Sequence, residues 1–227
     1  MIIEKPGLLS TIQDLGRKGY KRYGIISSGS MDQIAHRIAN MLVLNDEDDE
    51  AMEITMTGPV IQFQNDTMIA ITGGHLSPAI NEEKVEMYRP ILVRAGDVLS
   101  FGGAKEGIRS YLAVHGGFSI ERVMQSASTY LRAGIGGYKG RALKKGDVLP
   151  LKKPISIDEW DKPIKWSAKR FSHSQDNVQK TIRVIKGLQY YAFTEDSQRS
   201  FEEKEYTVMV YMVGSNPIFL KFSIAFF

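Results

Sequence analysis

STIQDLGRKGY, residues 10–20, and SSGSMDQIAHRIANMLVLN, residues 27–45, form the stretch from which the fold of this chain is read first. The first segment has no hydrophobic period. Residues 13–19 bring an amide, a carboxylate, a guanidinium and two glycines into seven positions. Loops of this kind, held by a rigid scaffold, often carry binding chemistry. We therefore expect a functional loop at residues 13–19.

The second segment has the pattern of a helix. Ser30 and Gln33 have the Ser-x-x-Gln spacing of a capping box. Apolar residues then recur at helical period, namely Met31, Ile34, Ala35, Ile38, Ala39 and Leu42. The sequence predicts one prominent N-terminal helix at about residues 31–44. Asp32 lies in its first turn, where the helix dipole favours an anion, so it either stabilises the helix start or belongs to a site.

Composition excludes several classes of protein. The chain has 43% hydrophobic and 24% charged residues, as soluble globular proteins do. A net charge of +3 without a dense basic run gives no indication of a nucleic-acid partner. The absence of cysteine excludes disulfides and thiolate metal sites and is consistent with the cytoplasm. No signal-peptide core and no run of roughly 20 apolar residues is present, so we expect a cytoplasmic protein with no membrane partner.

Short alternating segments separated by Gly and Asp turns predict a mainly β protein. The expected strands are residues 52–56, 60–63, 68–72, 91–93, 98–101 and 108–114. The second and third are expected to form a hairpin that turns at Asn65 and Asp66. Glu53 alternates with apolar neighbours, so it points away from the core and becomes a site residue if that face lines a cleft. The acidic run 46–50 is expected to be a solvated turn.

Two glycine-rich segments are candidates for contact with a ligand. Gly73 and Gly74 end a predicted strand before His75, and glycine allows the backbone to approach another group closely. His75 could donate to a substrate carbonyl, although a loop histidine is more often structural. Residues 126–141 combine hydroxyls with two arginines and four glycines, a composition suited to anion binding by backbone amides. Their spacing is not that of a P-loop.

Several motifs together resemble a bacterial family. T-I-Q-D-L-G-R-x-G-Y, G-S-M-D-Q, A-N-M-L-V-x-N and E-I-T-x-x-G-P occur in order, and G-G-x-x-G-R-A-L-x-x-G-D follows at residues 136–147. The pattern is similar to that of the biotin-dependent carboxyltransferase-like family, which includes the C subunit of 5-oxoprolinase, the second subunit of allophanate hydrolase and the carboxyltransferase region of urea carboxylase. The resemblance covers residues 6–149 and implies a cyclophilin-like β-barrel. The chain departs from the family at Gln125, where a glycine is usual.

The resemblance also implies a function. It indicates a subunit of an ATP-dependent 5-oxoprolinase, or of a related amide hydrolase or carboxyltransferase complex, that binds a small amide or lactam. ATP would be used together with companion subunits of the B type and the A type, and this chain has no biotin attachment site. The alternative is a non-catalytic regulator that sequesters a partner subunit, as an antagonist of a sporulation-kinase inhibitor. Fold likeness alone does not indicate prolyl isomerase activity.

The candidate site residues follow from the chemistry of such a substrate. A bidentate arginine is the natural clamp for a carboxylate, so we expect Arg17 to bind it. Asp14 and Asp32 could orient a lactam N–H or act as a general base, and glycine amides could stabilise an oxyanion. The predicted catalytic residues are Asp14, Asp32 and His75. The predicted substrate-binding residues are Gln13, Arg17, Asn40, Glu53, Gly73, Gly74, Ser126, Ser128, Thr129 and Arg141. No metal motif is present.

Glycine content suggests a domain boundary. Nineteen of the 21 glycines precede Pro150. We expect a cyclophilin-like β domain at residues 1–150, a linker or surface excursion at 151–180, and the incomplete start of a second β domain at 181–227. Strands are expected there at 181–187 and 206–211. Because the apolar tail 218–227 departs from the family pattern, we expect a C-terminally truncated gene product.

Overall fold

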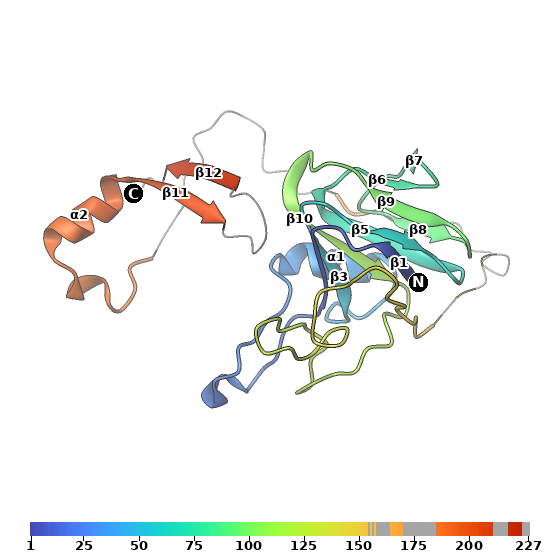
Figure 1. Ribbon diagram of the computed structural model, residues 1–227, viewed down its shortest axis with the longest axis horizontal. Helices are drawn as coiled ribbons and strands as arrows, with labels where there is room; N and C mark the ends of the chain where they lie inside the picture. Colours follow the sequence, from blue (N-terminus) through green and yellow to red (C-terminus); the bar gives the residue numbers. More distant parts are fainter. Residues whose placement is uncertain (154, 156, 158–163, 170–184, 211–217, 224–227) are drawn as a thin grey trace. The chain divides into compact units, whose positions relative to one another are not determined.

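A computed structural model describes residues 1–153, 155, 157, 164–169, 185–210 and 218–223 (Figure 1). The chain divides into two compact units, Met1–Arg170 and Phe171–Phe227, and each is considered by itself. Within the described ranges, no helix is long and apolar enough to cross a membrane.

The first unit consists of two antiparallel sheets. One has the strand order β1 (Ile2–Lys5), β4 (Val60–Gln62), β9 (Val98–Phe101), β6 (Pro78–Ile80) and β7 (Glu83–Lys84). The other has the order β2 (Leu9–Gln13), β3 (Ala51–Thr55), β10 (Glu106–Val114), β5 (Thr67–His75) and β8 (Pro90–Val93). The prediction of a mainly β fold is confirmed. Within the described residues, the strands of this unit form two five-stranded sheets, and no closed barrel is formed.

The expected hairpin of β4 and β5 is wrong. β4 pairs with β1 and β9, whereas β5 pairs with β10 and β8 in the other sheet. The turn that was expected to join two paired strands instead carries the chain from one sheet to the other. Alternation in the sequence shows which face of a strand is buried, and it contains no information on the strand's partner.

Both faces of the sheet formed by β2, β3, β10, β5 and β8 are covered. Ile12, Ile54, Ile69 and Leu112 face the other sheet, where they pack with Ile3, Ile61 and Leu99. The alternate residues, such as Ala51 and Tyr111, face α1 (Gln33–Leu42) instead. Figure 1 shows α1 beside β3 and β10, and α1 contacts β3, β5 and β10. Glu53, expected to be either exposed or at a cleft, is therefore buried.

The helix starts later and exposes a different face than expected. It begins at Gln33, with Asp32 as its N-cap, and the Asp32 carboxylate accepts a hydrogen bond from the Ala35 amide at 2.9 Å. The expected Ser30–Gln33 capping box is thus wrong. The expected apolar stripe is also displaced, since Met31 and Ile34 are 72% and 66% exposed. The polar residues His36 and Asn40 are buried in their place.

The second unit contains η2 (Tyr190–Ala192), α2 (Glu195–Glu203), and β11 (Glu205–Val210) paired antiparallel with β12 (Ile218–Ser223). The strand expected at 206–211 matches β11, and α2 was not expected. Most of the strand expected at 181–187 lies outside the described residues. The three-part domain division stays a prediction, although Ile155, Ile164 and Trp166 pack against the α1 cluster of the first unit.

Candidate functional site

Asp14, directly after β2, is held by four hydrogen-bond donors. Its Oδ1 accepts from Ser126 Oγ at 2.7 Å, from Ser128 Oγ at 2.5 Å and from the Gly16 amide at 2.7 Å, while Oδ2 accepts from the Ala127 amide at 2.6 Å. Burial raises the pKa of Asp14, but these hydrogen bonds outweigh it, and the pKa lies below its ordinary value. The backbone amide at residue 127 therefore binds an anion, as expected, but the anion is a side chain of the protein.

Arg17 lies in the same interior and is only 2% exposed. Its Nη2 donates to the Ser128 carbonyl at 2.5 Å, whereas Nε and Nη1 are buried without a hydrogen-bond partner. Burial lowers the pKa of Arg17, and the negative charge of Asp14 opposes this. A buried guanidinium with two unused donors can hold one more acceptor, because each unpaired donor is costly away from water.

Gln13 and Thr129 complete this group. Gln13 Nε2 donates to the Thr129 carbonyl at 3.4 Å and to Thr11 Oγ1 at 3.1 Å, and Gln13 Oε1 is buried without a partner. The amide and hydroxyl of Thr129 both donate to the Ile12 carbonyl. Residues 126–129 thus lie along β2 and its following loop. The structure brings the predicted residues Gln13, Asp14, Arg17, Ser126, Ser128 and Thr129 together.

Two backbone positions shape this group. A Cβ at Gly136, where φ is +67°, would collide with Arg17 Nη2 and the Ser128 carbonyl, so only glycine allows this close approach. Gln125, where the family usually has glycine, has φ of +62°. A left-handed conformation is unfavourable for a side chain such as glutamine, which accounts for the usual glycine.

Glu53 forms a second buried group at the start of α1. It accepts from Arg109 Nη1 at 2.6 Å, from Tyr111 Oη at 2.8 Å and from the Met31 amide at 2.8 Å. Tyr111 Oη also accepts from the Asp32 amide at 2.7 Å. Burial, followed by the charge of Glu53, raises the pKa of Tyr111 well above its ordinary value. The Asp32 backbone is thereby fixed, while its exposed carboxylate caps the helix.

A third group of polar residues, around Ser30 and His36, links α1 to the group formed by Asp14 and Arg17. The Ser30 amide donates to the Asp14 carbonyl at 2.9 Å, and Ser30 Oγ lies 2.7 Å from His36 Nδ1. Asn40 binds the Asp49 carbonyl, as His36 does. Asn40, a predicted substrate-binding residue, thus has internal partners. Sequence reasoning missed Ser30, His36, Tyr111 and Arg109. The sequence did contain one signal for the buried polar group. His36 and Asn40 are four residues apart on the predicted helix, so both lie on the same helix face.

Other predicted site residues lie elsewhere or are already engaged. The Gly73 amide donates to Tyr88 Oη at 3.0 Å, which leaves it no proton for an oxyanion. A Cβ at Gly74 would collide with the Arg109 backbone, so this glycine serves the irregular pairing of β5 with β10. His75 Nδ1 accepts from the Ser77 amide. No hydrogen bond in the described ranges connects His75 with Asp14 or Arg17.

Arg141 forms a bidentate pair with Asp147 at 2.7 and 2.8 Å. The hydrogen bonds from Arg141, ahead of the opposing effect of burial, lower the pKa of Asp147. Arg141 therefore closes the turn before Leu149, and its predicted role with substrate stays a prediction.

Three glycine amides of the segment 126–141 have partners within the protein. The amides of Gly134, Gly137 and Gly140 donate to the carbonyls of Tyr130, Ala127 and Gly136, so these three are not free to bind a phosphate. Binding of a ligand anion by this backbone stays a prediction. No step of the chemistry is therefore assigned to ATP on this chain. In the described ranges, no three His, Asp or Glu side chains are placed to hold a metal ion.

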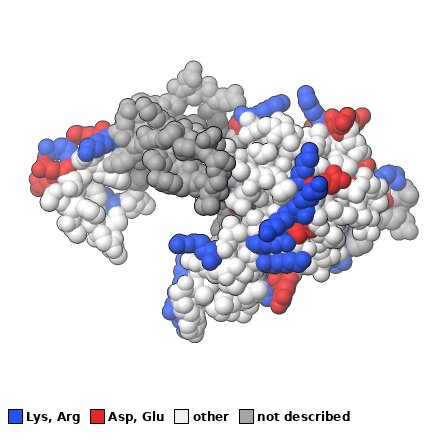
Figure 2. Space-filling model, viewed as in Figure 1, with Lys and Arg blue, Asp and Glu red and all other residues white. Residues whose placement is uncertain are grey.

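The candidate site is distinct from the charged surface. Lys and Arg side chains gather in a band on one part of the first unit, with carboxylates among them (Figure 2). Asp14 and Arg17 are buried and do not contribute to that band.

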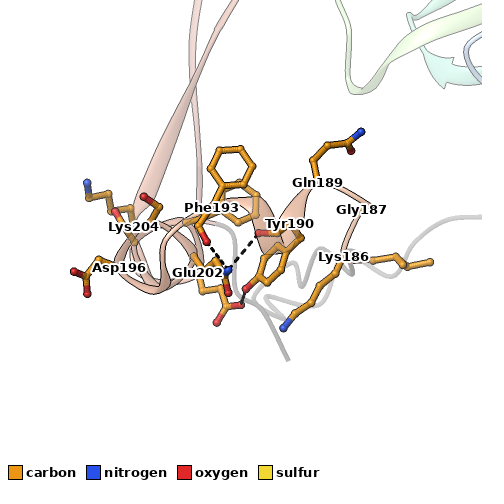
Figure 3. Close-up of a pocket in the computed structure, with 13 residues that line it drawn as sticks. Lys186, Gly187, Gln189, Tyr190, Phe193, Asp196, Glu202 and Lys204 are labelled. Carbon is orange, nitrogen blue, oxygen red and sulfur yellow. Dashed lines mark hydrogen bonds between the residues drawn. The ribbon is translucent and has the colours of Figure 1, made fainter.

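The second unit contains a hollow of about 1330 Å³ between η2 and α2 (Figure 3). Tyr190 Oη donates to Glu202 Oε1 at 2.7 Å, and Gln198 Nε2 donates to the Phe193 carbonyl at 2.8 Å. Ile185 and Phe193 line it, and both side chains are largely exposed. The described residues show no unpaired buried polar group in it, so it is a weaker candidate than the Asp14–Arg17 group.

Comparisons with known proteins identify relatives of this chain. Residues 23–211 match the family model of the carboxyltransferase domain, subdomain A and B. The chain is 36% identical over 204 residues to the 5-oxoprolinase C subunit of Escherichia coli, covering 88% of this chain and 61% of the relative. It is 42% identical over 153 residues to urea amidolyase of Lachancea kluyveri, covering 67% of this chain and 8% of the relative.

Solved structures show the same relationship. The crystal structure of K. lactis urea amidolyase matches with a TM-score of 0.78 and 32% identity, over 96% of this chain and 14% of that chain. The chain belongs to the carboxyltransferase domain family, subdomain A and B, as the sequence motifs predicted. It spans less than two thirds of the length of these relatives.

Proposed function

We propose that this chain is a subunit of an ATP-dependent complex that opens a small amide or lactam carrying a carboxylate, with 5-oxoproline as the first candidate substrate. The observation that carries the proposal is the buried Arg17 guanidinium with two unused donors. Relatives named as the C subunit of 5-oxoprolinase and as urea amidolyase support an amide-processing complex. ATP and the companion subunits would supply the energy for an otherwise uphill ring opening.

The unused atoms of the site complement such a substrate. Arg17 offers donors to a carboxylate, and Gln13 Oε1 offers an acceptor to a lactam N–H. The two side chains bind consecutive carbonyls, those of Ser128 and Thr129, so they belong to one neighbourhood. Because Arg17 is nearly enclosed, residues 126–129 and 136–137 would have to open locally to admit the ligand. Asp14 would hold this wall in place.

The test uses the full chain with its A-type and B-type companion subunits. Glutamate release from 5-oxoproline is measured with and without ATP. We expect Arg17→Lys to raise KM by about 10-fold or more, since lysine loses the planar fork. The matched control is Arg37→Lys, because Arg37 forms an exposed ion pair with Glu47. Unchanged KM in folded Arg17→Lys, or equal turnover of 2-pyrrolidinone, which lacks the carboxylate, would refute the clamp.

One observation favours the alternative of a protein-binding regulator. Ile34 and Met41 on α1, together with Met31 just before it and Leu44 just after it, are all more than half exposed, and exposed apolar patches commonly mark protein contacts. Under this proposal, Ile34→Glu abolishes binding to the companion subunit in a titration with purified proteins, and the complex releases no glutamate. Glutamate release that requires this chain would exclude a purely regulatory role.

A further inference from the structure

The Ser30 hydroxyl and the His36 ring have a defined direction of hydrogen bonding. Ser30 Oγ lies 2.7 Å from His36 Nδ1, and Nε2 on the other side of the ring lies 2.8 Å from the Asp49 carbonyl oxygen. Asn40 Nδ2 also lies 3.2 Å from Nε2, but the nearer Asp49 carbonyl oxygen can only accept, so we assign the proton of the neutral ring to Nε2. Nδ1 is then the acceptor, and the Ser30 hydroxyl donates to it.

The surroundings keep His36 neutral and fixed. It is fully buried, and its ring lies edge-on to the Tyr111 ring with 6.0 Å between the centroids. Burial lowers the pKa of His36 more than the hydrogen bond to Asp49 and the charges of Asp14 and Glu53 raise it. Asn40 Nδ2 donates to the same Asp49 carbonyl at 2.8 Å. The unprotonated Nδ1 is therefore available as a base near neutral pH.

Ser30 is held on its other side by a constrained turn. Ser28 and Gly29, directly before it, have φ of +55° and +99°, and the Ser30 amide donates to the Asp14 carbonyl. A non-glycine residue with positive φ is uncommon, and such strain clusters at functional sites. Ser30 is buried, with 6% exposure, and its hydrogen bond to His36 is buried as well, so an electrophile would reach Oγ through local opening.

We propose that Ser30 is a nucleophile and that His36 is its general base, acting on the carbonyl or phosphoryl group of a small electrophile. A serine beside a histidine that a third group orients is shared by hydrolases of unrelated folds. Here the Asp49 carbonyl orients the ring. The amides of Met31 and Asp32 already donate to Glu53 and Tyr111, so they have no part in the proposal.

The step balances without a further reactant. Ser30 Oγ forms a bond to the carbonyl carbon while its proton moves to His36 Nδ1. When the C–N bond of an amide breaks, that proton goes to the leaving nitrogen, and water then hydrolyses the ester on Ser30. With diisopropyl fluorophosphate, Oγ bonds to phosphorus, the P–F bond breaks, and fluoride leaves while His36 Nδ1 takes the proton of the hydroxyl. This inference goes beyond the proposed function, which requires no covalent intermediate on this chain.

The experiment is labelling of the full chain with diisopropyl fluorophosphate, read by intact-protein and peptide mass spectrometry. The variants are Ser30→Ala and His36→Gln. Ser77→Ala and His115→Gln are the controls. Ser77 has φ of +51° and lies beside His75, whose Nδ1 accepts from the Ser77 amide, while Ser77 Oγ donates to the Gly103 carbonyl. His115 Nδ1 lies 2.8 Å from the Val43 carbonyl oxygen, so its ring, like that of His36, is oriented by a backbone carbonyl.

We expect one adduct, on Ser30, absent in Ser30→Ala and formed about 100-fold more slowly in His36→Gln, with both controls labelled as the unchanged chain is. If circular dichroism shows that His36→Gln does not fold, the pH profile of the unchanged chain decides: labelling slows as pH falls through the pKa of His36. No adduct, an adduct elsewhere, an unaffected rate in folded His36→Gln or a flat profile overturns the inference. Labelling without lactam hydrolysis by the complex overturns only the proposed function.

Discussion

Asp14 and Arg17 illustrate how single side chains define this site. Four donors converge on the Asp14 carboxylate, so its negative charge serves to assemble the wall formed by residues 126–128. Arg17 is in the opposite state, with a buried charge and unused donors. The first side chain organises the structure, and the second carries the donors that bind the ligand under the proposed function. A general base is better sought in a group whose acceptor atoms are free.

Replacement of Asp14 by asparagine tests the first role. The new side chain would present an N–H₂ group where donors now converge, so we expect Asp14→Asn to lower the free energy of unfolding by about 2–4 kcal/mol. The measurement is urea unfolding. Asp32→Asn is the control, since asparagine caps a helix about as well as aspartate, and it should change stability by less than about 0.5 kcal/mol. Equal effects of the two variants would contradict the assignment.

Acid should lower the stability of the fold, in part by protonating Asp14. The pKa values of Asp14 and Asp147 are lowered from 3.8 in the folded state. Their stabilisation is therefore complete above the unfolded value and is lost as pH falls through the folded values. Burial raises the pKa of Asp49, which acts in the opposite sense. We expect the urea concentration at the unfolding midpoint to decrease once the pH drops below roughly 5, and to decrease less in Asp14→Asn. An identical profile in both proteins would contradict this.

At the scale of elements, the loop of residues 134–140 contributes shape to the site. Three of its glycine amides bind carbonyls of the same region, and Gly136 leaves room for the Arg17 guanidinium. The helix α1 contributes in a similar way. Its N-terminal residues are fixed by Glu53 and Tyr111, and its buried face carries His36 and Asn40 to the site. The loop thus makes room for a side chain from the segment after β2, and the start of α1 is held by side chains from β3 and β10.

Two glycines of the same loop separate backbone strain from steric contact. Gly134 and Gly136 have φ of +66° and +67°, but a Cβ at Gly134 meets nothing within 4 Å, whereas at Gly136 it collides with Arg17. We expect Gly134→Ala to cost about 1–2 kcal/mol from left-handed strain alone. Gly136→Ala should cost at least about 2 kcal/mol more, measured by urea unfolding. Equal costs would show that Arg17 moves freely.

At the scale of the whole molecule, the first unit contains both hydrophobic clusters. The larger lies between the two sheets, and the smaller lies beneath α1 and includes Trp166 and Ile164. Trp166 Nε1 donates to the Leu42 carbonyl at 2.9 Å, and the Ala168 amide donates to the Tyr88 carbonyl at 2.8 Å. The core of this unit therefore includes residues beyond the boundary expected at residue 150.

Truncation tests whether residues beyond 150 belong to the core of the first unit. We expect a fragment of residues 1–170 to unfold cooperatively, because both clusters lie within it. A fragment of residues 1–150 loses the cover that Trp166 provides, and its Tm should be lower by about 4–8 °C. Circular dichroism on heating compares the two. Equal Tm values would mean that residues 151–170 add no stability to the first unit.

The local pattern of the sequence was sufficient for the fold class, the family and the position of the helix. Period 2 and period 3.6 depend on neighbours in the chain, and they survive any tertiary arrangement. The motif around Asp14 and Arg17 singled out the loop whose side chains the structure brings together for the same reason, since its residues lie within seven positions.

Only the tertiary structure decided the partners. β4 and β5 entered different sheets, the helix buried His36 and Asn40 while exposing Met31 and Ile34, and Ser126 reached Asp14 across 112 positions of sequence. The physical reason is that a buried polar group must find donors or acceptors wherever packing places them. Such pairs depend on how the sheets and the helix pack together, and a pattern of polar and apolar residues along the chain does not specify that packing.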